Sequence, residues 1–410
     1  MWFRVFVASW TVAFAALLGW LATHESSEGG ILGRYSPGYF ALLLGLAAAV
    51  TVSFLAQRPF LYRRLYAVRR EIILVLSSTL ISLIMVEVAI RVFDPLGISY
   101  FEYATRYHLD KVPDPVLVFK HAPGLHKTYG HFRVLTNDSG LRDRKLETKQ
   151  DGELRILLLG DSVTFGSGVS IEATFGRKLE GMLTAKLGRP VRTVNTGVGG
   201  YNTVQEYAVL RTFFNVVDPD VVVLLYVRND IESNDPPFDP WSEVSLQGKS
   251  PPRVIAILLG KSWLYRLGAF ALDYSRSQRP ASLDRNARGV KESMDALAGI
   301  ASFCRERGVT FVTFFYRTRE QQSRGSSAAL LSEVESIGRT SSFPVADVGS
   351  WWGDVDMRSV TNSRVDSHPN ERGHELLAGK MADFLMTHGL VSNGAVSSTE
   401  ALLTSRSVPH

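Results

Sequence analysis

The stretch LLLGDSVTFGSG, residues 157–168, places an aspartate–serine pair directly after a run of leucines. Arg155 is followed by four apolar residues, 156–159, a run that is typical of a strand buried on both faces of a parallel sheet. Gly160 ends this strand, and two further glycines loosen the segment after it. Open α/β sheets bind ligands at the carboxyl ends of their strands. Ser162 is therefore expected to be either a reactive group or a simple turn residue.

Short apolar strands alternate with amphipathic helical stretches from residue 155 onward. This alternation predicts βαβ units and a parallel sheet with helices packed on it. The expected strands are residues 155–159, 191–195, 221–227, 309–315 and 344–348. The expected helices are residues 174–187, 204–214, 286–307, 328–337 and 369–388. Residues 233–280 are rich in proline and aromatic residues and have no clear period, so we expect an insertion that caps the site.

The composition limits the classes of partner. The 410 residues are 45% hydrophobic, enough for one large domain and an extra region. The single cysteine, Cys304, excludes an intrachain disulfide and leaves the redox compartment open. Lys and Arg outnumber Asp and Glu by 8 to 5 in residues 1–99, and by 37 to 35 in the remainder. A nearly neutral body does not suggest a nucleic-acid partner.

Three apolar stretches, residues 3–22, 39–56 and 72–90, fill the front of the chain. Each approaches the ~20 residues that cross a bilayer as a helix. Residues 1–95 are therefore predicted to be a membrane anchor with three transmembrane helices. Two alternatives remain: the first stretch is a cleaved signal peptide, or the region is a buried helical hairpin of a soluble protein. No A-x-A cleavage site lies directly before His24, which disfavours the signal peptide.

The arginines predict the orientation of this anchor. Residues 57–71 carry five arginines, whereas residues 24–37 carry only Arg34. The positive-inside rule places the five-arginine loop in the cytoplasm, so everything after about residue 94 lies on the extracytoplasmic side. Glu87 and Arg91, near the end of the third stretch, either pair at the membrane interface or mark the end of the hydrocarbon core, and the second interpretation is favoured here.

A serine hydroxyl is a weak nucleophile until a base takes its proton. The sequence VDSHPNERGHELLAG, residues 365–379, offers His368 with Asp366 beside it, just ahead of a predicted helix. Pro369 suits the first turn of that helix, which leaves His368 in the loop. This loop follows the fifth strand, so it emerges at the same edge of the sheet as Ser162. His374 lies inside the helix and is expected to pack there.

An acyl-transfer site also needs donors for a developing oxyanion. The segment NTGVGGYNT follows the second strand and contains Gly197, Gly199 and Gly200, whose backbone N–H groups are free to turn toward a substrate. Asn229, after the third strand, offers a side-chain amide. Taken singly, the glycines are equally consistent with a tight turn and Asn229 with a helix cap.

Four blocks follow strands of one sheet in order: GDSVTFG, NTGVGGYNT, YVRND and DSHPNERGH. This combination resembles the SGNH, or GDSL, hydrolase superfamily over about residues 119–388. The upstream segments FKHAPG and NDSGLRDR are similar to those of membrane-anchored bacterial members. The resemblance implies a flavodoxin-like three-layer α/β/α domain with a five-stranded parallel sheet. It also implies Ser162 as nucleophile and N–H donor, Gly200 and Asn229 as further oxyanion donors, His368 as base, and Asp366 as the acid that orients it.

The chain departs from the family pattern in three places. The usual Asp-x-x-His is Asp-x-His here, because residue 365 is Val. If Asp366 does not reach the imidazole, a backbone carbonyl or another acid such as Asp347 or Asp354 orients it. Arg228 replaces a glycine and is expected to point outward or to contact an anionic substrate group. Val163 replaces the leucine of GDSL, a mild change.

These features predict four regions. They are the anchor (1–95), an N-terminal extension with a small β element (96–150), the SGNH hydrolase domain with an insertion (151–390), and a disordered tail (391–410). The leading hypothesis is a serine esterase that hydrolyses an acyl or acetyl ester, held in a bacterial inner membrane with its catalytic domain outside the cytoplasm. Alternatives are an O-acyltransferase or deacetylase acting on cell-surface polysaccharide, and a non-catalytic glycan-binding module. No cofactor or metal is expected, and a transporter is disfavoured.

Overall fold

The computed structural model describes residues 2–23, 37–232, 261–268, 287–318, 321 and 325–392. The chain divides into a helical unit, Met1–Phe101 with Asp239–Arg276, and a sheet unit, Glu102–Phe238 with Ser277–His410. Most of the predicted cap at 233–280 and of the predicted tail at 391–410 lies outside the described residues.

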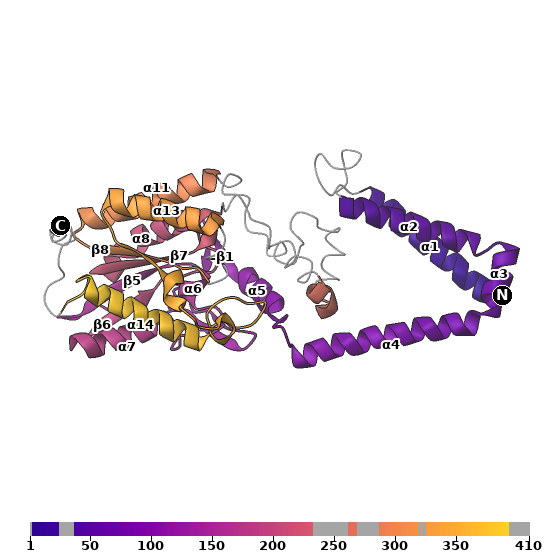
Figure 1. Cartoon of the computed structure of the whole chain (residues 1–410), viewed down its shortest axis with the longest axis horizontal. Helices are drawn as coiled ribbons and strands as arrows, with labels where there is room; N and C mark the ends of the chain where they lie inside the picture. The colour runs from indigo at the N-terminus through magenta and orange to yellow at the C-terminus, as the bar shows by residue number, and fades with distance from the viewer. Residues whose placement is uncertain are drawn as a thin grey trace. The chain divides into compact units, whose positions relative to one another are not determined.

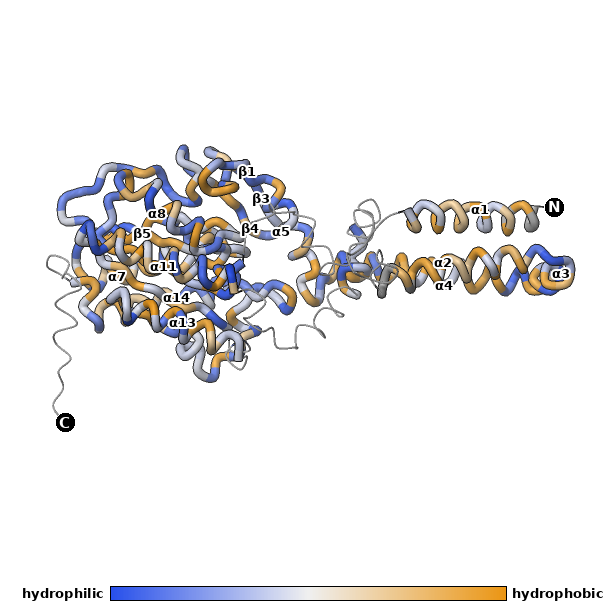
Figure 2. Tube along the Cα trace, turned by 90° about the horizontal axis from the view of Figure 1, so that it is seen from above, coloured by the Kyte–Doolittle hydropathy of each residue, from blue (hydrophilic) through white to orange (hydrophobic). Residues whose placement is uncertain are grey.

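The helical unit begins with four helices, drawn in indigo and purple in Figure 1: α1 (Trp2–Ala22), α2 (Pro37–Leu55), α3 (Pro59–Ala67) and α4 (Arg69–Phe93). α1 and α2 pack on each other around the buried side chains of Leu21 and Leu43. Hydrophobic residues run along α1, α2 and α4 (Figure 2). Most apolar side chains of α4 are exposed, so the described residues provide no protein core around this helix.

The prediction of three transmembrane helices is not confirmed. Within the part of the chain that the structure describes, one helix, α4 (Arg69–Phe93), is long and apolar enough by itself to cross a membrane. Leu42–Leu55 and Pro59–Ala67 meet the same criterion only together, and they are bent by 92°. The break falls at Pro59, because proline disfavours helical backbone at the residue before it. The apolar part of α1, Val7–Ala22, is shorter than a span.

Glu87 and Arg91 of α4 form an ion pair, with Arg91 Nε 2.8 Å from Glu87 Oε1. Glu87 also accepts hydrogen bonds from the backbone N–H groups of Trp263 and Leu264, at 2.9 and 2.8 Å. The side chain of Ser262 donates to the same carboxylate, at 3.0 Å. Glu87 therefore satisfies the first N–H groups of a short helical segment of the insertion as a capping residue does.

A five-stranded parallel sheet forms the centre of the sheet unit, which confirms the predicted fold class. Its strands are β5 (Leu154–Gly160), β6 (Val191–Asn195), β7 (Val221–Tyr226), β8 (Thr310–Phe315) and β9 (Val345–Asp347). They lie in the order β6-β5-β7-β8-β9, and every neighbouring pair is parallel. This order is the flavodoxin-like one, with the switch point beside β5. Each predicted strand boundary lies within one residue of the observed one.

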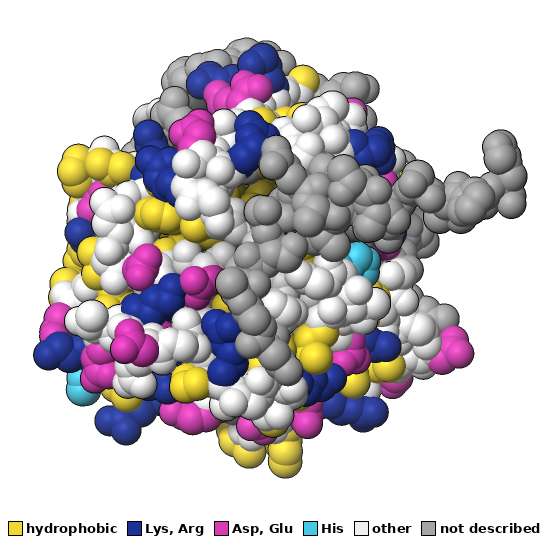
Figure 3. Space-filling view, turned by 90° about the vertical axis from the view of Figure 1, so that its left-hand side faces the viewer, with side chains coloured by type: hydrophobic (Ala, Val, Ile, Leu, Met, Phe, Trp, Pro, Cys, Tyr) yellow, Lys and Arg dark blue, Asp and Glu magenta, His cyan; other side chains and the backbone are white. Residues whose placement is uncertain are grey.

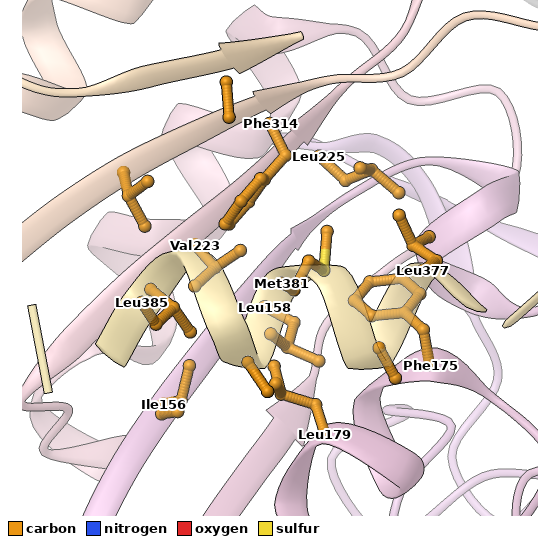
Figure 4. Close-up of a cluster of buried hydrophobic side chains, with 14 of the residues drawn as sticks. Ile156, Leu158, Phe175, Leu179, Val223, Leu225, Phe314, Leu377, Met381 and Leu385 are labelled. Carbon is orange, nitrogen blue, oxygen red and sulfur yellow. The ribbon is translucent and has the colours of Figure 1, made fainter. Parts of the chain in front are cut away.

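Helices cover both faces of this sheet (Figure 1). α7 (Phe175–Leu187) and α14 (Glu371–Thr387) pack on one face, and α8 (Thr203–Val217), α11 (Ala287–Glu306) and α13 (Gly325–Ser341) on the other. Because side chains alternate along a strand, Ile156 and Leu158 of β5 face the first core, where they meet Leu179 and Met381 (Figure 4). The intervening Leu157 faces the second core.

The N-terminal extension supplies one helix and two hairpins to the sheet unit. α5 (Tyr100–Leu109) precedes the antiparallel pair β1 (Lys111–Asp114) and β2 (Val118–His121), and then β3 (His126–Tyr129) and β4 (Phe132–Leu135). Positive and negative side chains are interspersed over the face of the sheet unit seen in Figure 3. That mixture agrees with the near-neutral charge of this part of the sequence.

Candidate active site

Ser162 is the first residue of α6 (Ser162–Phe165), which follows β5 without a loop. Gly160 makes the turn at φ +149°, and a Cβ there would lie 2.1 Å from Thr164 Oγ1. The position therefore requires glycine. Asp161 caps α6 by accepting a hydrogen bond from the N–H of Val163, at 3.0 Å. The sharp turn leaves Ser162 at the carboxyl edge of the sheet.

The structure brings Ser162, His368 and Asp366 into one chain of hydrogen bonds. Ser162 Oγ lies 2.8 Å from His368 Nε2. His368 Nδ1 lies 2.5 Å from Asp366 Oδ1, whose side chain is 1% exposed. Burial alone would raise the pKa of Asp366, but the hydrogen bonds from His368 and Tyr103 hold it below its usual value. Asp366 is thus kept as a carboxylate against the ring.

A tight loop lets the Asp-x-His spacing work. The hydroxyl of Ser363 accepts hydrogen bonds from the N–H groups of Val365 and Asp366, at 3.2 and 2.9 Å. The N–H of His368 donates to the Asp366 carboxylate, at 3.1 Å, so the loop folds back on itself. The alternative acid Asp347 is instead bound by two nitrogens of Arg317, at 2.9 and 2.6 Å. Asp366 is the acid in contact with His368.

The expected oxyanion donors gather at the same strand ends. Asn229 lies in the 3-10 turn η1 (Arg228–Ile231), and its Nδ2 donates to Asp161 Oδ2 at 2.9 Å. Ser162 Oγ lies 3.0 Å from that same oxygen. Gly200 follows β6 with φ +83°, a backbone state that favours glycine. Among the residues that the structure describes, neither the N–H of Gly200 nor that of Ser162 has a hydrogen-bond acceptor.

Residues 158–376 match the family described as GDSL-like Lipase/Acylhydrolase, a stretch that covers more than half of the chain. The chain belongs to this family. It is accordingly an SGNH-type serine ester hydrolase. No curated protein is a detectable relative of the chain.

Several solved structures are similar to this GDSL-like hydrolase. TesA is 14% identical and is matched over 57% of this chain and 98% of its own, with a TM-score of 0.38. The acetyl xylan esterase AlAXEase is 13% identical over 57% of this chain and 100% of its own, with a TM-score of 0.37. A two-domain esterase active on acetylated mannans, CEX, is 16% identical over 57% of this chain and 49% of its own, with a TM-score of 0.38.

The other residues singled out in the sequence have structural contacts. His374 is fully buried in α14, and its Nδ1 accepts a hydrogen bond from the N–H of Phe175, at 3.1 Å. Burial lowers the pKa of His374 to about 3, so it is neutral and ties α14 to α7. The N–H of Gly197 donates to Asn195 Oδ1, at 2.9 Å. Arg228 is half-buried at the start of η1.

The extension of the GDSL-like hydrolase contacts the site, although it precedes the matched region. Tyr107 Oη accepts a hydrogen bond from the N–H of Gly199, at 2.9 Å, and Lys111 Nζ donates to the Gly199 carbonyl. The guanidinium of Arg142, 1% exposed, donates to the carbonyls of Phe165 and Gly166, at 2.8 and 2.7 Å. The extension therefore supports both the serine block and the glycine block. The sequence feature that could have indicated these contacts is the frequency of aromatic and basic residues over 100–144.

Two carboxylic acids that the sequence reasoning missed lie buried near the serine turn. Glu206 of α8 and Asp230 of η1 are each 1% exposed. Burial raises the pKa of both groups well above their usual values, and the charge of Asp161 adds to both shifts. Among the described residues, neither oxygen of Glu206 has a hydrogen-bond partner. Glu206 and Asp230 therefore favour the neutral form, which adds no negative charge beside Asn229.

We expect Glu206→Gln to stabilise the protein more at pH 8 than at pH 5. A group whose pKa is raised by folding contributes stability below its unfolded pKa, and this contribution is lost as pH rises through the folded pKa. Gln removes the ionisation, and each pKa unit corresponds to about 1.4 kcal/mol. Thermal unfolding of the full chain in detergent measures the difference. The exposed Glu375→Gln is the control, and an equal effect of Glu206→Gln at both pH values contradicts the assignment.

Proposed function

We propose that this hydrolase cleaves an acyl or acetyl ester with Ser162 as its nucleophile. His368 Nε2 takes the proton of Ser162 as Oγ bonds to the carbonyl carbon. The tetrahedral intermediate collapses, the ester C–O bond breaks, and His368 returns the proton to the leaving alcohol. Water then attacks the acyl-enzyme with His368 again as base, which releases the acid and restores Ser162. Asp366 orients the ring and stabilises the imidazolium.

The proposed oxyanion donors are the N–H groups of Ser162 and Gly200 and the side-chain amide of Asn229. Two features support this assignment. The two backbone N–H groups have no acceptor among the described residues, and they sit at neighbouring strand ends. Asn229 is held by Asp161, so its amide is fixed before substrate arrives. Donors that are already in place do not need to reorganise when charge develops, which is how such groups lower the barrier.

The observation that carries the proposal is the continuous relay of 2.8 Å from Ser162 to His368 and 2.5 Å from His368 to Asp366. Such a relay predicts an acyl-enzyme intermediate. The test is stopped-flow release of p-nitrophenol from p-nitrophenyl acetate by the full chain in detergent. We expect a burst of about one equivalent per active site when deacylation is slower than acylation. Absence of ester turnover by the folded protein contradicts the proposal.

Transfer of the acyl group is the alternative outcome at the same site. A hydroxyl of a cell-surface polysaccharide would replace water in the second step, and the first step would be unchanged. Adding acylated and unacylated oligosaccharides to the burst experiment separates the two outcomes, because transfer yields acylated sugar in place of free acid. Family membership disfavours a non-catalytic glycan-binding module.

We further propose that the helical unit anchors the enzyme in a lipid bilayer, with the sheet unit outside the cytoplasm. The support is α4, whose apolar side chains lie exposed along its length. The arginines of residues 57–71 support the orientation, because cytoplasmic loops carry an excess of Lys and Arg.

Single introduced cysteines test this topology, since the native Cys304 is buried. We expect Asp151→Cys, in the sheet unit, to react with a membrane-impermeant maleimide on spheroplasts. Tyr66→Cys, in α3 of the arginine-rich segment 57–71, is expected to react only after the membrane is permeabilised. The reverse pattern contradicts the orientation, and equal labelling of both cysteines in a soluble fraction contradicts the anchor.

A further inference from the structure

The carboxylate of Asp366 has a partner from outside the family-matched region. Tyr103 of α5 donates its phenolic hydrogen to Asp366 Oδ2, at 2.6 Å. Asn362 Nδ2 donates to the same oxygen, at 3.1 Å. The other oxygen, Oδ1, accepts from the ring and the N–H of His368. Each oxygen of the buried carboxylate therefore has its own pair of donors.

We propose that Tyr103 is a positioning residue for catalysis, acting through Asp366 on His368. This inference rests on the proposed function of the relay. An aspartate only two residues before the histidine is held by one short loop, and its carboxylate can rotate about the bond to its Cβ. Donors on Oδ2 fix that rotation so that Oδ1 faces the ring. Tyr103 supplies the shorter of these two bonds, and hydrogen bonds to a charged acceptor are the stronger class.

Residues of the N-terminal extension pack closely around the side chain of Tyr103. Its ring meets Phe132 edge-on, with the centroids 5.8 Å apart and the planes at 83°. Gly130, in the turn between β3 and β4, has φ +56°, and a Cβ there would lie 2.6 Å from Tyr103 Cδ1. His131, beside that turn, hydrogen-bonds the Gly168 carbonyl at 2.8 Å. The hairpin therefore closes over the tyrosine and ties it to the serine loop.

Through Tyr103, the extension keeps the carboxylate of Asp366 oriented toward His368. Deleting the phenolic oxygen leaves Oδ2 with Asn362 as its remaining side-chain donor, inside a site that is closed to water at Asp366. The carboxylate then samples rotations in which Oδ1 no longer faces His368 Nδ1. The ring loses its orientation toward Ser162, so the chemical step slows while substrate binding is unaffected.

The test compares Tyr103→Phe with a matched control in the full chain. Tyr129→Phe removes a hydroxyl from the same extension, one that donates to Asp110 at 2.8 Å. We expect Tyr103→Phe to lower kcat on p-nitrophenyl acetate by about 10-fold with KM unchanged, because small misplacements of catalytic groups cost this much or more. Tyr129→Phe is expected to stay within about 2-fold of wild type in kcat. Thermal unfolding of both variants confirms that each is folded.

A double-mutant cycle separates positioning from simple structural support. In an Asp366→Ala background the carboxylate is gone, so Tyr103→Phe is expected to change the residual kcat by less than about 2-fold. An equal loss in both backgrounds assigns Tyr103 a structural role and overturns the proposal, as does a Tyr103→Phe enzyme with wild-type kcat. If Ser162→Ala keeps its activity, the proposed function itself fails. An inactive Ser162→Ala beside a fully active Tyr103→Phe overturns only this inference.

Discussion

Ser162→Ala is expected to lower kcat on p-nitrophenyl acetate by about 10⁵-fold or more, which leaves only the residual acceleration that substrate binding and the proposed oxyanion donors supply. The reason is that Ser162 Oγ is the hydroxyl oxygen that lies 2.8 Å from His368 Nε2. Asp161 is the nearest acid, but its carboxylate is occupied by Val163 N–H, Asn229 and the serine itself. Binding of a substrate analogue is expected to survive, since the proposed oxyanion donors remain.

Ser170→Ala is the matched control for this experiment. Ser170 is exposed and lies in the same loop region, eight residues further along. It is expected to keep full activity. A Ser162→Ala protein that retains more than about 1% of wild-type kcat would remove Ser162 from the role of nucleophile, since the loss expected for a nucleophile is far larger.

Asn229→Ala is expected to lower kcat by about 10²- to 10³-fold, with little change in KM. Its amide is directed to the site by Asp161, so its contribution is largest when negative charge forms on the substrate oxygen. A loss confined to kcat indicates an interaction made in the transition state. A rise in KM at constant kcat would instead make Asn229 a substrate-binding residue.

Asn229→Asp sharpens the same test. The substitution keeps the size of the side chain but places a second carboxylate beside Asp161. Both the lost donor and the added charge oppose an oxyanion, so we expect Asn229→Asp to be at least as impaired as Asn229→Ala. Higher activity in Asn229→Asp than in Asn229→Ala would mean that bulk, and not hydrogen-bond donation, is what the position supplies.

The sheet and the core of the site could be predicted from the sequence because both depend on local patterns. Short apolar runs mark buried parallel strands, and parallel strands carry their carboxyl ends to one edge. Ser162, Asn229 and Gly200 come two, three and five residues after the ends of β5, β7 and β6, so their meeting is a consequence of the topology. His368 lies further on, 21 residues after the end of β9, in the loop just before α14.

The remaining features depend on contacts that no local pattern reports. Tyr103 and Asp366 are 263 residues apart in sequence, and nothing near either residue indicates the other. Glu206 stands in an amphipathic helix, where a glutamate is usually solvated, but it is buried. Asp366 contacts His368 because hydrogen bonds to Ser363 fold the loop tightly. The number of residues between Asp366 and His368 does not predict that fold. The hydropathy of residues 1–95 indicated apolar helices, but it did not indicate the helix break at Pro59.

The most direct test of the central claim is covalent labelling of the full chain in detergent with a fluorophosphonate, followed by peptide mass mapping. A serine activated by the His368–Asp366 pair is predicted to carry a single adduct on Ser162, formed far more slowly in His368→Ala. A well-folded protein that takes no label, or that takes it on a different serine, would contradict the account.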